Sequence, residues 1–293
     1  MTIVYDGKLS TPTLSAMRLS TALIMGLDIK YPQRSTLNEY FKHLVNRLPS
    51  PKERVCMRYL AIGNRGHDVV KDDDGFSDME PRAKTANMSG LFNGYPLVLR
   101  PAGNDLSDEM RKQYAFRIRE EHGGRLYWAY YLKRIKMVGV ETNDILIVRE
   151  NGVAKADEFH YTDADLFPQP VKLPDYDYDN DRNIAIPDGR YVSSNATVSI
   201  AFDEFDVAEL QNVYNILRGT AKRAVISELA LCSGLDFPHT GDSEEGSKFT
   251  YNEAIGVQAL YHISLYKNVA QENQGFVVNV TVGQPAPFFI GSA

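Results

Sequence analysis

Asp175, Asp177 and Asp179 alternate along a short acidic stretch, and alternating carboxylates of this kind open the calcium-binding loop of EF-hand proteins. That loop needs glycine at its sixth position and a bidentate glutamate at its twelfth. Here the sixth position is Asn180 and the twelfth is Ile186. The sequence therefore favours a solvated acidic segment, or one that docks on a basic neighbour, over a calcium site.

The histidines are the other candidates for metal or acid–base chemistry. They are His43, His67, His122, His160, His239 and His262. No two of them have the spacing of a helical zinc site or of a zinc finger. The chain also lacks a phosphate-binding G-x-x-x-x-G-K-S/T loop and a G-x-S-x-G nucleophile elbow. We therefore expect no catalytic, cofactor-binding or metal-binding residues, no cofactor, and a protein that is not an enzyme.

Composition and charge restrict the classes of protein that this chain fits. Its residues are 43% hydrophobic, which argues against disorder over most of the chain. A net charge of −6 disfavours binding to duplex nucleic acid through phosphate neutralisation. The N-terminus lacks the pattern of a signal peptide, and no apolar run of about 18 residues predicts a membrane span. We expect folding in a reducing cytoplasm, Cys56 and Cys232 as buried free thiols, and no contact with a membrane.

The elements that must position these residues begin with two predicted helices. Thr11 and Pro12 fit the cap and first position of one helix, and the capping box Thr36–Glu39 opens a second, amphipathic one. The apolar run 55–63 then predicts a buried strand. The polar segment 64–93 is too long for a simple connector, so we expect a long loop that is functional or that orders on assembly.

An aromatic β-hairpin is predicted in the middle of the chain. Apolar and polar residues alternate over 114–120 and again over 126–132, on either side of a Gly123-Gly124 turn. The alternation puts Trp128 and Tyr130 on one face of the hairpin. It puts Tyr127 and Tyr131 on the other face.

A change of composition divides the chain into two predicted lobes. Prolines and aspartates dominate 168–189, which we interpret as a linker. The N-terminal lobe, 1–167, holds the helices, the long loop, the aromatic hairpin and a second hairpin that turns at Asn151-Gly152. The C-terminal lobe, 190–293, has a polar loop over 234–250 and an extended C-terminal arm. We predict an α+β fold, with N-terminal helices and β-hairpins followed by a strand–helix–strand–strand–strand lobe.

Five segments of the sequence, taken together, carry a resemblance to known proteins. They are Tyr59–His67, Leu97–Leu106, Tyr127–Lys133, Ile226–Gly234 and Glu253–Gln258. Together they resemble structural proteins of tailed-bacteriophage virions, of the neck, collar or baseplate class. The resemblance spans most of residues 36–285 and carries no catalytic residues with it.

The resemblance implies a structural component of the virion that folds in the host bacterial cytoplasm. One place for it is a neck ring, the head-to-tail connector or collar that joins the portal to the tail. The alternative place is the baseplate or tail tip. Its partners would be copies of itself in a ring of six or twelve, together with portal, neck or tail-terminator proteins. DNA would pass without specific binding, in keeping with the acidic net charge.

Contacts between subunits are expected where apolar residues have no obvious local partner. Prolines keep the C-terminal tail extended, and the apolar residues after them suit an adjacent subunit, with packing on the tail's own domain as the alternative. The residues expected to make subunit contacts are Phe288, Phe289, Ile290, His67 and Trp128.

Two other functions stay open at this point. The aromatic hairpin would be the platform of a carbohydrate-binding or receptor-binding module if one pair of its rings were exposed. A hydrolase would need two convergent carboxylates drawn from distant parts of the chain, because the spacing of such a pair is set only in space.

Overall fold

The structure, a computed structural model, describes residues 3–7, 10–12, 16, 19–20, 23, 50, 53, 55–71, 73–75, 77–82, 84–85, 87–151, 153–160, 189–242 and 248–287. The chain forms two compact units. The larger comprises Met1–Met137 with Ser199–Asn279, and the smaller comprises Val138–Val198 with Val280–Ala293. The described part is mostly β, with two α-helices and antiparallel sheets that include a half-barrel.

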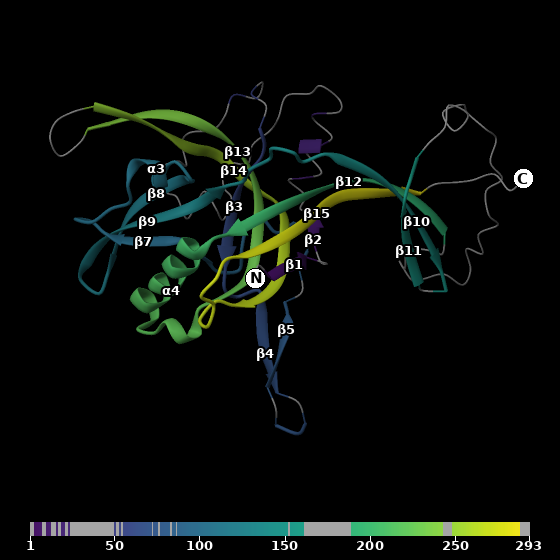
Figure 1. The fold of residues 1–293 in the computed structure, drawn as a ribbon, viewed down its shortest axis with the longest axis horizontal. Helices are drawn as coiled ribbons and strands as arrows, with labels where there is room; N and C mark the ends of the chain where they lie inside the picture. The colour runs from purple at the N-terminus through teal and green to yellow at the C-terminus, as the bar shows by residue number, and fades with distance from the viewer. Residues whose placement is uncertain are drawn as a thin grey trace, which may run out of the picture. The chain divides into compact units, whose positions relative to one another are not determined.

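The larger unit is built on an eight-stranded sheet (Figure 1). Its main path runs β2 (Ser10–Pro12), β14 (Lys248–Asn268), β13 (Val225–Asp242), β3 (Cys56–Gly63), β9 (Arg125–Arg134) and β7 (Val98–Pro101). Two more strands join at the side, β6 (Gly94–Tyr95) on β3 and β8 (Tyr114–His122) on β9. The pairing of β13 with β14 shifts register at three places, and such bulges bend the strands that carry them.

Helix α4 (Glu204–Arg218) packs on this sheet through a buried apolar stripe of Val207, Leu210, Val213 and Tyr214. Asp203 and Asp206 form a capping box at its start, and Gly219, at φ 70°, ends it in the left-handed conformation. The largest fully buried side chains of the larger unit include the rings of Tyr59, Tyr130, Phe116, Phe202 and Phe276.

The smaller unit contains a β-hairpin. Strand β10 (Thr142–Glu150) pairs with β11 (Val153–Glu158), and Asn151 at their turn has φ 52°. These strands belong to a five-stranded sheet in the order β1 (Ile3–Gly7), β15 (Phe276–Pro287), β12 (Gly189–Phe202), β10 and β11.

Several expectations from the sequence are confirmed. The two predicted hairpins are β8–β9, which turns at Gly123 and Gly124 with φ of 58° and 75°, and β10–β11. The order β12, α4, β13, β14, β15 matches the strand–helix–strand–strand–strand pattern. None of the described helices is long and apolar enough to cross a membrane.

Other expectations are wrong. Thr11 and Pro12 lie in β2, where they pair with β14, and do not begin a helix. Cys56 is exposed, while Cys232 is buried, and both are free. The segments 64–93 and 234–250 contain paired strands where long loops were predicted. Strands β4 and β5 pair across a turn at Gly75, whose φ is 82°, and residues 235–242 pair with 248–255. The predicted helix over 36–49 lies outside the described residues, as does the linker 168–189 up to its last residue.

Candidate functional site

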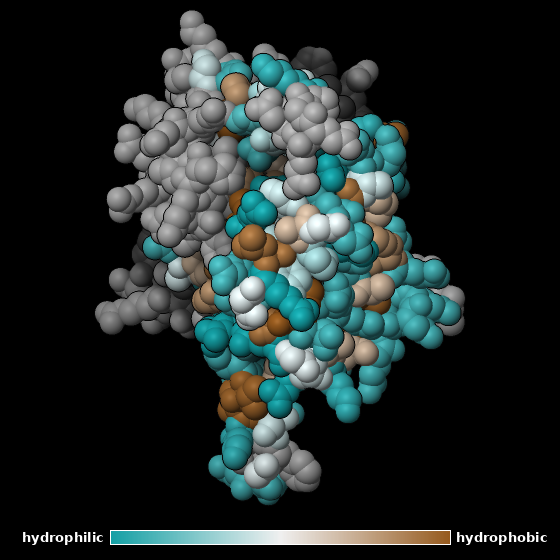
Figure 2. Space-filling view, turned by 90° about the vertical axis from the view of Figure 1, so that its left-hand side faces the viewer, coloured by the Kyte–Doolittle hydropathy of each residue, from teal (hydrophilic) through white to brown (hydrophobic). Residues whose placement is uncertain are grey.

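One strand pair of the larger unit forms a ribbon of its own. Strands β4 (His67–Lys71) and β5 (Ser77–Pro81) make a two-stranded sheet, the lowest projection in Figure 1. Val69 lies directly across from Met79, and these two residues are 64% and 40% exposed. Figure 2 shows hydrophobic side chains on this projection beside hydrophilic ones. Because a lone two-stranded ribbon is marginally stable in water, its exposed apolar pair suits a partner.

A buried glutamate holds the base of this β4–β5 ribbon. Glu228, in β13, has no exposed surface. Its carboxylate accepts hydrogen bonds from the backbone N–H groups of Phe92 and Asn93, each at 2.9 Å, and of Arg65 at 3.3 Å. The chain just before β4 and the chain that follows β5 are therefore held by one side chain of the central sheet.

Two glycines allow the chain to approach Glu228 this closely. At Gly63 a Cβ would overlap the side chain of Glu228, and at Gly66 it would overlap the backbone of Ser227. The N–H of Gly66 donates to the Ser227 hydroxyl at 2.8 Å. The direction in which the ribbon leaves the sheet thus depends on these two residues without side chains.

His262 makes the fourth hydrogen bond to the carboxylate of Glu228. Its Nε2 lies 2.9 Å from the carboxylate, and the residue is 2% exposed. Burial lowers the pKa of His262 against the opposing effect of Glu228, so the imidazole is neutral. Its Nε2–H therefore donates a hydrogen bond to the carboxylate of Glu228. Burial alone would raise the pKa of Glu228, but hydrogen bonds from His262, Asn93 and Phe92 outweigh it and leave that pKa below its ordinary value. Glu228 is therefore an anion held by four donors.

Lys84 and His67 lie near this anion and share its desolvated surroundings. Burial lowers the pKa of Lys84 to about 8, against the attraction of Glu228, and burial also lowers the pKa of His67. The ring of His67 meets Tyr266 edge-on, with centroids 5.6 Å apart. These groups have acid–base chemistry, but Glu228 and His262 are closed to solvent. The cluster therefore holds the base of the β4–β5 ribbon.

The distal part of the β13–β14 hairpin is a second ribbon. Residues 235–242 pair with β14 only, after the pairing of β13 with β3 has ended. Phe237 and Tyr251 are each 39% exposed there. The ring of His239 stacks on Tyr251 and meets Phe237 edge-on, with centroids 5.7 and 5.1 Å apart. Like the β4–β5 ribbon, it presents apolar surface away from the core.

A pocket opens where the end of α4 faces the chain after β3. It has a volume of about 570 Å³ and is lined by Asn64, Tyr214, Leu217, Arg218, Arg223 and Val225. The Tyr214 hydroxyl accepts from Asn64 at 2.8 Å and donates to the carbonyl of Val225 at 2.9 Å. Neither arginine forms an ion pair within the part of the chain that the structure describes. We call this the arginine pocket.

The aromatic hairpin does not present an open platform. Tyr127, Tyr130 and Tyr131 are buried. Trp128 is partly exposed, but the guanidinium of Arg117 lies 3.6 Å from its ring centroid and that of Arg119 lies 5.6 Å away. Arginine stacking of this kind takes up the ring surface that a sugar would use.

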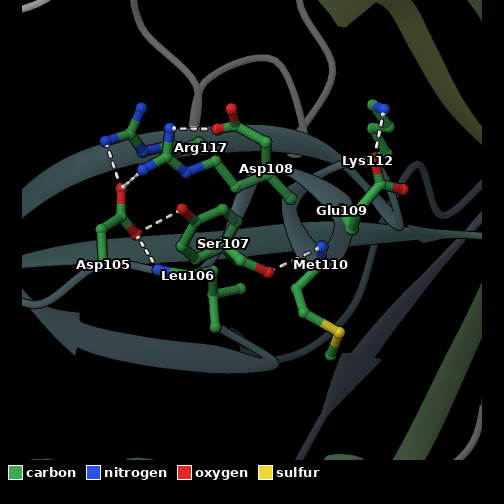
Figure 3. Close-up of polar contacts among 10 residues, drawn as sticks. Asp105, Leu106, Ser107, Asp108, Glu109, Met110, Lys112 and Arg117 are labelled. Atoms are coloured by element: carbon green, nitrogen blue, oxygen red, sulfur yellow. Dashed lines mark hydrogen bonds and ion pairs between the residues drawn. The ribbon is translucent and has the colours of Figure 1, made fainter.

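Asp105 holds the stacked arginine in place (Figure 3). Its carboxylate accepts from Arg117 at 2.5 Å and from the N–H of Leu106 at 2.7 Å. The short helix α3 (Asp108–Arg111) follows, capped by Ser107 through a 3.4 Å bond from Met110. A sugar could stack on the covered side of Trp128 only by displacing Arg117 from Asp105.

The residues expected to contact other subunits are only partly described. Phe288, Phe289 and Ile290 lie outside the described residues. His67 begins β4 at the foot of the ribbon, and Trp128 lies in β9 under Arg117. Sequence reasoning missed the apolar pair on the ribbon and the arginine pocket. The turn signal Asp74-Gly75, with Gly75 at φ 82°, would have indicated the ribbon, whereas no local pattern marks the pocket.

A metal site is not found among the described residues, where no three His, Cys, Asp or Glu side chains converge. The acidic stretch 175–181 lies outside that part of the chain.

Comparison with known proteins places the chain in a family. All of it, residues 1–293, matches a family of unknown function, DUF7208. The chain belongs to that family. No curated protein and no solved structure matches it.

Proposed function

We propose that this DUF7208 protein is a structural, non-enzymatic subunit of a tailed-phage virion, located in a neck ring that joins the portal to the tail. The observation that carries the assembly role is the β4–β5 ribbon, which exposes the cross-strand pair Val69 and Met79. Buried Glu228 holds the chain at the base of this ribbon. A baseplate or tail-tip position is the alternative within the same class. The phage context itself rests on the resemblance of the sequence.

Rigid anchoring supports a role in contact with neighbours. A ribbon that served only to connect β3 with β6 would gain nothing from exposing valine and methionine. An element that inserts between subunits needs apolar side chains on a defined face, and cross-strand pairing places Val69 and Met79 on one such face.

The test has two readouts. In the first, mass spectrometry of purified particles and a reconstruction of their neck should find the chain in a ring. In the second, Val69→Ser/Met79→Ser should lower the mass of the purified protein's oligomers in sedimentation velocity, with unchanged circular dichroism. Val138→Ser/Val153→Ser is the matched control, since these valines are 98% and 68% exposed outside the ribbon. Absence from particles, or a ribbon variant that assembles like the control, would contradict the proposal.

A further inference from the structure

The arginine pocket presents two cations, Arg218 and Arg223, which form no ion pair among the described residues, beside an apolar lining. From Gln211 to Val225 the sequence carries three cations, Arg218, Lys222 and Arg223, and no carboxylate. A cation in the last turn stabilises the C-terminal end of a helix, which explains Arg218. Arg223 lies beyond the end of α4, so stabilisation of the helix end does not explain its place in the same pocket.

The chemistry of the pocket selects an acidic ligand. The hydroxyl of Tyr214 and the amide of Asn64 are already hydrogen-bonded to each other. The guanidinium groups of Arg218 and Arg223 are therefore the donors that the pocket presents to a ligand. Guanidinium forks match carboxylates in a bidentate geometry. Leu217 and Val225 add apolar lining, so the ligand should carry carboxylates together with apolar side chains.

The β4–β5 ribbon carries that combination. Residues 67–81 contain six carboxylates against the single cation Lys71. Asp73 and Asp74 stand exposed at its turn, and Val69 and Met79 follow along one face. Strands about 5 Å apart make a narrow tip.

The ribbon cannot fill the pocket of its own chain. Asn64, in the wall of the pocket, is three residues before β4 begins, so the pocket lies at the foot of the ribbon. Five residues of extended strand carry the turn roughly 16 Å away from that foot. A ribbon turn that fills the pocket must therefore come from another copy.

We propose that the acidic turn of the β4–β5 ribbon of one copy docks in the arginine pocket of the next copy. The contact joins two different surfaces, so an open row of copies has a free pocket at one end and a free turn at the other until a ring closes. This inference rests on the proposed assembly function and names its contact. It also predicts salt sensitivity, because the paired charges lie near the surface.

Complementary charge reversal tests the contact on the full-length protein. The pocket variant is Arg218→Glu/Arg223→Glu, and the turn variant is Asp73→Lys/Asp74→Lys. Each alone should weaken self-association at least about 100-fold, since each leaves like charges facing one another. An equimolar mixture should restore an oligomer in which the two variants alternate, because the intact turn fits the intact pocket and the reversed turn fits the reversed pocket. The four substitutions in one chain should restore the oligomer.

The control Lys136→Glu/Lys155→Glu makes the same change of charge as the pocket variant and should assemble normally; both lysines are exposed. Circular dichroism confirms that each variant folds, and sedimentation velocity measures the association. The inference is overturned by a monomeric wild type, by single variants that assemble normally, or by a mixture and a quadruple variant that stay monomeric. If Val69→Ser/Met79→Ser dissociates the oligomer while charge reversal does not, the docking contact fails and the assembly function stands. Loss from particles without loss of self-association would assign the pocket to another partner protein and also overturn it.

Discussion

Glu228 shows at the residue scale how one carboxylate organises distant chain segments. It sits in a central strand, yet its donors come from residues 65, 92, 93 and 262. Burying a carboxylate costs several kcal/mol unless donors replace the lost water. Full hydrogen bonding makes the site specific, since removal of any donor leaves part of the desolvation cost uncompensated.

Gly63→Ala tests the closeness of this packing. The new Cβ would overlap the side chain of buried Glu228, which cannot move without losing its donors. Overpacking of this kind should cost about 2 kcal/mol in the free energy of unfolding by urea. Gly103→Ala is the matched control, because nothing lies within 4 Å of a Cβ there, and its effect should stay within about 0.5 kcal/mol. Equal stability of the two variants would contradict the role given to Gly63.

The same cluster predicts how stability depends on pH. The pKa of His262 is lower in the folded chain than its ordinary value near 6.5, so the unfolded chain binds more protons as pH falls past that value. Glu228 also has a lowered pKa, so its contribution is complete above its unfolded pKa and is lost only at more acidic pH. The urea midpoint should therefore fall as pH is lowered from 7.5 to 5.5.

His262→Gln isolates the contribution of the histidine, since glutamine keeps an N–H donor for Glu228 and does not titrate. The midpoint of this variant should change less between pH 7.5 and 5.5, with a remainder from His67, whose pKa is also lowered by burial. A slope equal to that of the wild type would assign the pH dependence to other groups.

At the element scale, α4 is docked on the sheet by buried charge as well as by its apolar stripe. Lys133 of β9 pairs with Asp206 in the first turn of the helix, and these side chains are 13% and 2% exposed. Burial raises the pKa of Asp206, although Lys133 opposes that change. Asp206 also accepts from the N–H of Asp203 at 3.0 Å, so it serves the helix cap and the docking contact together.

Lys133→Met should destabilise the protein by roughly 3 kcal/mol, because it leaves the carboxylate of Asp206 buried without its cation. Adding Asp206→Asn should return part of that loss, since asparagine removes the unpaired charge and keeps an acceptor for the cap. Thermal unfolding of the two single variants and the double variant gives the coupling. A double variant no more stable than Lys133→Met would show that the charge pair does not dock the helix.

At the scale of the whole molecule, the first residues of the chain protect sheet edges. β1 is the edge strand next to β15, and β2 is the edge strand next to β14. Uncovered edges expose N–H and C=O groups that pair with other chains. Strands β1 and β2 thus cover one edge of each of these sheets.

Deleting residues 1–12 should therefore promote aggregation on refolding, measured by light scattering, while deletion of Met1 and Thr2 alone should not. The edges of β14 and β15 are left open only in the longer deletion. Identical scattering from the two deletions would argue against edge protection.

The sequence by itself determined the hairpin turns and the end of helix α4, because their conformation depends on residues adjacent in the chain. Gly123-Gly124 and Asn151 adopt the positive φ that tight hairpin turns require, and Gly219 ends α4 for the same reason. The same helix begins at a capping box. The cap is Asp203, and Asp206 is the third residue of the capping box.

Tertiary structure alone decided the candidate site. Nothing in the neighbourhood of Glu228 in the sequence indicates a buried anion, because its donors are up to 163 residues away. The arginine pocket likewise joins Asn64 to Tyr214, which are 150 residues apart. Turn and helix signals act through the dihedral preferences of adjacent residues, whereas burial, charge compensation and pocket shape depend on which distant segments the folded sheet brings together.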